Sequence, residues 1–296
     1  MFRRSPMALV AVLLALVLAA CGSSGGSSTP SSASTTQAAS PAPHRIVSLS
    51  PPATESLFAI GAGDQVVAVD DQSNYPAEAP HTKLSSYQPN VEAIAEYNPD
   101  LVVMSYDPGD VVAGLKQLHI RVLMQEAPTD LDGAYAQIEE LGDVTGHPAE
   151  AKHVVAEMQD HVAEVASDKP GAGLAVYHEI SPDYYSATSK TFIGSVYTLL
   201  GAKNIADAAG ANAPDYPQLS AEYVVDSDPD VIVLSDTKCC DQSAKTVRAR
   251  PGWDDLSAVK AGNIVPVNDD IASRWGPRIV DFVDMVAQAF ERASGA

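Results

Sequence analysis

Two glutamates stand at matched places in a motif that the chain carries twice. Glu92 lies seven residues before Pro99-Asp100, and Glu222 lies seven residues before Pro229-Asp230. A carboxylate in the first turn of a helix is favoured by the helix dipole, so charge complementarity alone would explain one such residue. Because both copies of the motif carry a glutamate at the same place, we interpret the pair as serving a shared task at two similar sites.

The residues after each glutamate predict a short helix and then a buried strand. Proline restricts the residue before it to non-helical backbone, so Asn98 and Asp228 mark the predicted helix ends. The apolar runs 101–103 and 231–233 have no polar alternation, which is typical of strands covered on both faces in a parallel sheet. A repeat so widely spaced in the sequence predicts two similarly built α/β lobes.

Aromatic side chains concentrate in predicted loops that follow strands or precede helices. Loops at the carboxyl ends of parallel strands line the ligand crevice in open α/β sheets. Tyr and Trp present a flat apolar face with a polar tip, which suits a large amphipathic ligand. Any single tyrosine is more often an ordinary packing residue, so the group matters more than its members. These aromatic residues are Tyr75, Tyr87, Tyr106, Tyr184, Tyr185, Tyr216 and Trp275.

The chain has three cysteines, and they fall into two groups. Cys21 ends an apolar run that is too short for a comfortable membrane span and is preceded by Arg3 and Arg4. The stretch before it, Leu18-Ala19-Ala20, resembles the lipobox of bacterial lipoproteins, in which the cysteine is lipidated. Cys239 and Cys240 are adjacent. Whether they form a disulfide is left open, because neighbouring Cα atoms about 3.8 Å apart lie below the usual disulfide range.

Composition and periodicity set the predicted segments. Residues 1–20 form a signal peptide, and the Ser/Gly/Thr-rich tract 21–43 forms a disordered tether, because it cannot bury enough apolar surface to fold. Between the two repeats, apolar residues recur at helical spacing from about 148 to 166. We predict a bridging helix at 147–168 between lobes 44–146 and 169–296, with a surface helix inside one lobe as the alternative.

Charge and motifs disfavour nucleic-acid binding and catalysis. The formal net charge of −20 opposes binding to nucleic acid. After residue 43 the sequence has no Gly-x-Ser-x-Gly elbow, no Walker loop and no Gly-x-Gly-x-x-Gly following its first strand. The seven histidines form no coordinating pattern. We therefore expect no catalytic residue, no metal site and no cofactor, with an extracytoplasmic enzyme as the disfavoured alternative.

Several stretches together resemble a known family. They are RIVSLSPPATESLFAIGAGDQVVAVDDQSNYP, SATSKTFIGSVYTLLGAKNI, YPQLSAEYVV and RWGPRIVDFV, with the spacing from each glutamate to Pro-Asp. This set resembles the class III substrate-binding proteins of bacterial ABC importers. It is most similar to the periplasmic cobalamin-binding proteins, with ferric siderophore and haem binders as relatives, and the similarity runs from Arg45 to Phe290.

The resemblance implies an α/β fold of two Rossmann-like lobes joined by a single long helix, with the ligand between the lobes and little hinge motion. It also implies that Glu92 and Glu222 dock onto arginines of the permease. The predicted binding set is Tyr75, Tyr87, Tyr106, Tyr184, Tyr216, Arg274 and Trp275.

The expected function is that of a lipid-anchored, monomeric, extracytoplasmic binding protein. It would deliver a corrinoid of the cobalamin type to a permease dimer with its ATPase subunits. A ferric siderophore or haem is the alternative ligand, since Arg274 and Arg278 could pair with carboxylates. Two departures from the cobalamin binders bear on the ligand rather than the fold: Tyr87 and Tyr216 where Trp is frequent, and the loop with the two adjacent cysteines.

Overall fold

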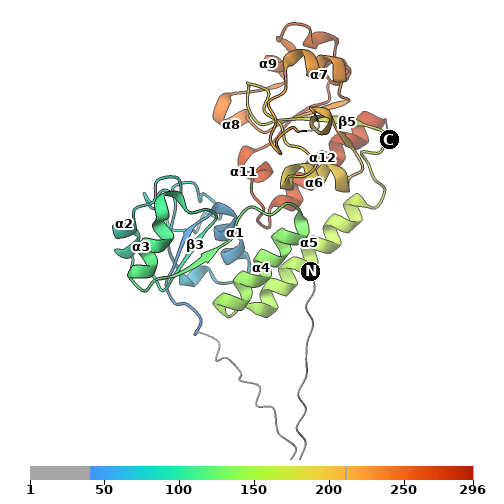
Figure 1. Ribbon diagram of the computed structural model, residues 1–296. Coiled ribbons are helices and arrows are strands. Elements are labelled where there is room, and N and C mark those ends of the chain that lie inside the picture. Colours follow the sequence, from blue (N-terminus) through green and yellow to red (C-terminus); the bar gives the residue numbers. More distant parts are fainter. Residues whose placement is uncertain (1–40, 211, 296) are drawn as a thin grey trace, which may run out of the picture. The chain divides into compact units, whose positions relative to one another are not determined.

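The computed structural model describes residues 41–210 and 212–295 (Figure 1). The predicted signal peptide, nearly all of the predicted tether and the predicted lipidation site Cys21 lie outside the described residues. From Pro41 onward the chain forms one compact unit. In this part of the chain, no helix has both the length and the apolar character needed to cross a membrane.

The first lobe is built on a parallel sheet with the strand order β2-β1-β3-β4. Strands β1 and β3 are buried at every position, which explains why their sequences show no polar alternation. The strands are β1 (Ile46–Leu49), β2 (Val66–Val69), β3 (Leu101–Met104) and β4 (Arg121–Met124). The helices of this lobe are α1 (Pro51–Ala59), α2 (Val91–Ala95), α3 (Val111–Gln117) and α4 (Leu131–Thr145), with 3-10 turns at Gly63–Gln65 and Pro108–Asp110.

The second lobe repeats this plan with the strand order β6-β5-β7-β8, again parallel. Its strands are β5 (Ala175–Glu179), β6 (Lys203–Asn204), β7 (Val231–Leu234) and β8 (Ile264–Pro266). Its helices are α6 (Phe192–Leu199), α7 (Ala221–Ser227), α8 (Thr237–Cys240), α9 (Ala244–Arg248), α10 (Ser257–Ala261) and α11 (Asp269–Ala272), with 3-10 turns at Ile205–Ala208 and Trp253–Asp255. The two sheets have equivalent strand orders, which confirms the prediction of two similarly built lobes.

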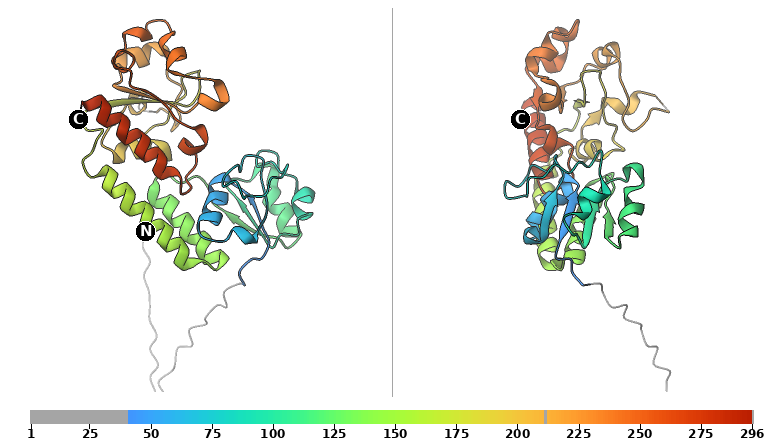
Figure 2. Two further views of the ribbon diagram at one scale, coloured as in Figure 1. Left: turned by 180° about the vertical axis from the view of Figure 1, so that it is seen from behind. Right: turned by 90° about the vertical axis from the view of Figure 1, so that its left-hand side faces the viewer.

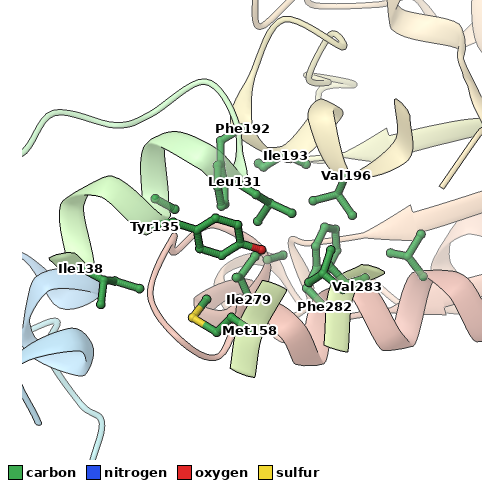
Figure 3. Packing of buried hydrophobic residues seen from close by; sticks show 14 of the residues in the cluster. Leu131, Tyr135, Ile138, Met158, Phe192, Ile193, Val196, Ile279, Phe282 and Val283 are labelled. Atoms are coloured by element: carbon green, nitrogen blue, oxygen red, sulfur yellow. The ribbon is translucent and has the colours of Figure 1, made fainter. Parts of the chain in front are cut away.

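Two long helices complete the chain. Helix α5 (Pro148–Ala166) begins with its proline in the first turn, and α12 (Ile279–Ser294) is the last element. Helix α5 packs against α4 and α12, and α4 and α5 lie side by side (Figure 2). Side chains from α4, α5, α6 and α12 share one apolar cluster, which includes Tyr135, Met158, Phe192 and Phe282 (Figure 3).

Each Pro-Asp pair of the repeated motif fastens two strands of its sheet. The Asp100 carboxylate accepts a hydrogen bond from the backbone N–H of Arg45, directly before β1 (3.0 Å). The Asp230 carboxylate accepts one from the backbone N–H of Ala175, the first residue of β5 (2.8 Å). The residue before each proline has a left-handed φ, 47° and 41°, and lies beyond the last helical residue. Asp228 directly follows the last residue of α7, as predicted, whereas α2 ends at Ala95, three residues before Asn98. Both residues lie outside the right-handed helical region that a following proline disfavours.

Candidate ligand-binding site

A hollow of about 310 Å³, here called the Tyr87 hollow, lies among the loops that follow β1, β2 and β3 and the connection from α11 to α12. Tyr87 and Tyr106 face each other in its lining with 6.2 Å between ring centroids, and they are 69% and 40% exposed. Arg274 and Trp275 contribute another wall. The structure thus brings together four members of the predicted binding set.

A buried carboxyl group, Asp70, lies next to the lining residues Ser86 and Tyr106 of the Tyr87 hollow. Asp70, at the end of β2, is 2% exposed, and its carboxylate accepts a hydrogen bond from the Ser73 hydroxyl. Burial raises the pKa of Asp70, although the Ser73 and Ser86 hydroxyls oppose this shift. Desolvation also raises the pKa of the Tyr106 phenol. Tyr106 therefore stays a neutral hydrogen-bonding group at physiological pH.

The Arg274 guanidinium is already committed within the protein. Its Nη1 donates to Asn74 Oδ1 (2.9 Å) and contacts Glu55 Oε1 (3.3 Å). Its Nη2 donates to the Gln72 carbonyl (2.9 Å) and pairs with Asp270 (3.0 Å). The residue is 8% exposed. Arg274 lines the hollow with a guanidinium that is already paired with Glu55 and Asp270, and it is not a free site for an anion.

Tyr75 lies in a second hollow of about 490 Å³, here called the Tyr75 hollow. The Arg278 guanidinium stacks on its ring, 4.0 Å from the centroid. Arg278 also donates from Nε to Glu55 Oε2 (2.9 Å) and from Nη2 to Glu55 Oε1 (2.5 Å). Tyr75 therefore does not share a hollow with Tyr87, and Glu55 of α1 is shared by the arginines of both hollows.

In the second lobe, the alternation of side chains along two extended segments determines which tyrosine rings are exposed. Segments 184–188 and 215–219 run antiparallel, with a bridge between Tyr185 and Gln218. Side chains alternate between faces in extended backbone, so Tyr185 and its diagonal neighbour Tyr216 share a face, and they are 42% and 47% exposed. Tyr184 instead stacks on Trp253, 5.7 Å between centroids. Tyr184 is therefore a packing residue of this lobe, and Tyr185 is the tyrosine whose ring is exposed.

Trp275 fixes the connection between α11 and α12. Its indole Nε1–H donates to Gln137 Oε1 on α4 (2.9 Å), and its ring meets Phe192 edge-on at 6.4 Å. The ring is half-buried and lines the Tyr87 hollow. Trp275 thus combines an anchoring contact with a surface that faces the hollow.

Glu92 and Glu222 occupy equivalent exposed positions. Each is the second residue of its helix, after an N-cap residue, Asn90 or Ser220, that accepts a backbone hydrogen bond. The burial pattern over 91–99 is the same as over 221–229. Neither glutamate side chain has a hydrogen bond or ion pair within 41–210 and 212–295. Both carboxylates are therefore available to an external cation.

A buried charge cluster lies beneath the loops of the second lobe. Glu179, at the end of β5, is fully buried and accepts two hydrogen bonds from Arg250, at 2.6 and 2.5 Å. Asp236 is also fully buried, and its carboxyl oxygens have no hydrogen-bond partner among the described residues. Desolvation, followed by the charge of Glu179, raises the pKa of Asp236 to about 7. Sequence reasoning did not single out this cluster.

The structure also describes the two adjacent cysteines and the groups that could hold a metal ion. Cys239 and Cys240 are joined by a disulfide at the end of α8, and Cys239 is exposed. Among the described residues, no group of three or more His, Cys, Asp or Glu side chains is arranged to hold a metal ion.

Comparison with known proteins places the chain in a family. Residues 46–270 match the family model described as periplasmic binding protein. A cobalamin-binding protein of Halobacterium salinarum is 33% identical over 262 residues, which cover 85% of this chain and 70% of that protein. An uncharacterized ABC transporter substrate-binding lipoprotein of Bacillus subtilis is 30% identical over 258 residues, covering 83% and 80%. The solved structure of the periplasmic vitamin B12 binding protein BtuF of Vibrio cholerae superposes with a TM-score of 0.72 at 25% identity, covering 86% of this chain and 99% of that one. The chain therefore belongs to the periplasmic binding protein family, in the class III form that its sequence predicts.

Proposed function

We propose that this protein captures a corrinoid of the cobalamin type and delivers it to an ABC importer. Its family consists of solute-binding proteins that work outside the cytoplasm, and it is not a family of enzymes. The ligand class is supported by relatives that are named for cobalamin. It is also supported by the chemistry of the two hollows, which offers aromatic faces and hydroxyl groups but no unpaired cation among the described residues.

The main support for a corrinoid ligand is that both arginines of the hollows are already paired with Glu55. Arg274 and Arg278 are the cations that line the two hollows, and both bind Glu55. A carboxylate brought into either hollow would lose its hydration without gaining a free guanidinium, which is costly for a buried charge. Haem and carboxylate siderophores carry such groups. A corrinoid presents a flat macrocycle with amide side chains, which exchange hydrogen bonds with phenols without a net charge.

Equilibrium titration tests the ligand class directly. Cyanocobalamin, dicyanocobinamide, haemin and a ferric hydroxamate would each be titrated into the full chain and followed by absorbance. We expect the two corrinoids to bind more tightly than haemin. Equal or tighter binding of haemin would overturn the corrinoid proposal and favour the alternative ligand.

The tyrosines are tested by a double substitution. Tyr87→Ala with Tyr216→Ala should weaken cyanocobalamin binding by roughly tenfold, because aromatic contacts contribute about 0.5–1.5 kcal/mol each beyond area burial. Leu118→Ala is the matched control, since Leu118 is 51% exposed and lines neither hollow. Unchanged affinity in the double variant would exclude these two rings from the site.

We propose that Glu92 and Glu222 dock the protein onto a permease dimer that works with ATPase subunits. A single exposed ion pair contributes little, often below about 1 kcal/mol, but two pairs on one body reinforce each other through effective concentration. Glu92→Ala with Glu222→Ala should leave cyanocobalamin affinity unchanged and strongly reduce uptake into cells. Glu96→Ala with Asp226→Ala is the control, because it removes an exposed charge four residues after each of the two glutamates. Normal transport by the first double variant would refute docking.

We also propose that the protein acts as a monomer held to the membrane by lipid on Cys21. The proposal rests on the resemblance of Leu18-Ala19-Ala20-Cys21 to a lipobox. Cys21→Ala should abolish incorporation of a labelled fatty acid and release the protein from membranes. Labelling that persists in this variant would place the anchor elsewhere.

A further inference from the structure

The Cys239–Cys240 bridge closes α8, a helix of four residues at the end of β7. The two Cα atoms are 3.8 Å apart, the separation across a trans peptide bond. The disulfide and this peptide bond therefore form one small ring, which restricts the backbone of both cysteines. Helices of this length are not stable by themselves in water. The conformation of α8 thus depends on the ring and on the contacts of its first turn.

The first turn of α8 is attached to the start of α11. Asp269 accepts hydrogen bonds from the backbone N–H groups of Thr237 (3.0 Å), Lys238 (3.1 Å) and Cys239 (3.0 Å). The Thr237 hydroxyl donates to the same carboxylate (2.9 Å). The Lys238 ammonium pairs with Asp270. The bridged turn and the first two residues of α11 therefore hold each other in place.

Helix α11 carries this attachment to the Tyr87 hollow. Asp270 lines the hollow, pairs with Arg274 (3.0 Å) and accepts a hydrogen bond from Asn74 (2.9 Å). Ser273, Arg274 and Trp275 continue the same wall. A short chain of polar contacts thus connects the disulfide, through Asp269 and Asp270, with the residues that line the hollow.

We propose that Cys239–Cys240 is a thiol–disulfide exchange site whose oxidation state sets the order of this wall. Because Cys239 is exposed, the thiolate of a dithiol reductant can attack its sulfur. The attack forms a mixed disulfide and releases the Cys240 thiolate. The second thiol of the reductant then displaces Cys239 and leaves as a cyclic disulfide. Two electrons and two protons have passed to the protein, and both cysteines are thiols.

Reduction removes the ring that restricts α8. Ordering the freed backbone then carries a larger entropic cost, so α8 spends more time away from its folded conformation. When α8 unfolds in this way, its N–H groups no longer donate hydrogen bonds to Asp269. Residues 269–275 then lose one of the contacts that hold them in place. Residues 269–275 are therefore more ordered in the oxidised protein than in the reduced protein.

Hydrogen exchange tests this connection without any ligand. The sample is the full chain with Cys21→Ser, which leaves Cys239 and Cys240 as its only cysteines. Alkylation should label neither cysteine before treatment with dithiothreitol and both afterwards. Reduction should speed amide exchange by about tenfold, equivalent to about 1.4 kcal/mol, in both 236–242 and 269–275. The additional change Cys239→Ser with Cys240→Ser should give fast exchange with or without dithiothreitol.

Cyanocobalamin affinity provides the second readout and rests on the proposed function. The reduced protein should bind cyanocobalamin about tenfold more weakly than the oxidised protein, in line with a free-energy change of about 1.4 kcal/mol. The double serine variant should bind equally weakly with and without dithiothreitol, which controls for effects of the reductant on the cobalt. Both cysteines alkylated before reduction, or faster exchange confined to 236–242, would overturn the redox proposal. If exchange responds as expected while the oxidised protein binds no cyanocobalamin, the proposed ligand fails and the redox site stands.

Discussion

Glu55 is the buried anion on which the arginines of both hollows depend, and its neutralisation is the most informative perturbation. Glu55 lies on α1 and is 3% exposed. Arg278 holds it through two hydrogen bonds of 2.9 and 2.5 Å, and Arg274 contacts it at 3.3 Å. Glu55→Gln keeps the size of the side chain and one acceptor oxygen. It removes the charge and turns an NH₂ group towards the guanidinium groups.

The expected loss of stability follows from what each arginine retains. Removing one partner of a buried ion pair costs about 3–5 kcal/mol. Arg274 keeps Asp270, Asn74 and the Gln72 carbonyl, and the Arg278 side chain is 19% exposed. For these two reasons we expect a smaller loss than for a fully buried pair. Glu55→Gln should lower the free energy of unfolding by about 2–4 kcal/mol.

Urea unfolding measures this loss, and Glu78→Gln is its matched control. Glu78 lines the Tyr75 hollow, is exposed and has no ion pair among the described residues, so its neutralisation should change stability by less than about 0.5 kcal/mol. Glu55→Gln should also gain affinity for haemin, because a guanidinium becomes available to its carboxylates, whereas Glu78→Gln should gain less. Equal stabilities of the two variants, with no gain for haemin, would refute the argument that Glu55 commits both arginines.

Two further predictions concern the buried carboxyl group of Asp236 and the two aspartates of the repeated motif. Burial and Glu179 raise the pKa of Asp236 to about 7, above an unfolded value of about 3.9, so the folded state holds its proton more tightly. This contribution is fully present below about pH 4 and is lost as the pH rises to about 7. Asp236→Asn should abolish that part of the decline in the urea midpoint between pH 4 and 8, and identical pH profiles would contradict the shift. Asp230→Ala should cost about 1–2 kcal/mol by leaving the half-buried N–H of Ala175 unpaired, and Asp100→Ala should cost less, about 0.5–1 kcal/mol, because water can replace its exposed bond to the Arg45 N–H. Their effects should add in the double variant, because they act on different sheets, and a clear departure from additivity would show that the two sheets do not respond independently.

Local patterns were sufficient to predict most of the fold. The buried strands β3 and β7 were readable because a parallel strand covered on both faces carries an uninterrupted apolar run. The long helix α5 was readable because its apolar residues recur at helical spacing. The duplicated architecture followed from one repeated motif, because the Asp of each Pro-Asp pair accepts a hydrogen bond from the backbone at the start of a neighbouring strand.

The choice between Tyr184 and Tyr185 required information that is not local. One residue separates a ring packed on Trp253 from an exposed ring beside Tyr216. Which of the two faces outward depends on the register with segment 215–219, set by the contact of Tyr185 with Gln218. A shift of one residue in an extended segment exchanges the two faces. The sequence shows both tyrosines but not their partner strand.

The role of Arg274 depended on a partner much further away. In a loop with Trp275 and Arg278 it has the composition of an anion site, and an anionic ligand was therefore a reasonable alternative. Its partner Glu55 lies 219 residues earlier, inside an apolar helix where a single carboxylate reads as a solvent-facing residue. Once Glu55 is found buried between the two arginines, the same guanidinium groups become part of the scaffold rather than the recognition surface. The two hollows then present aromatic rings, hydroxyl groups and carboxylates such as Glu78, but no unpaired cation among the described residues, so the buried carboxylate of α1 disfavours an anionic ligand.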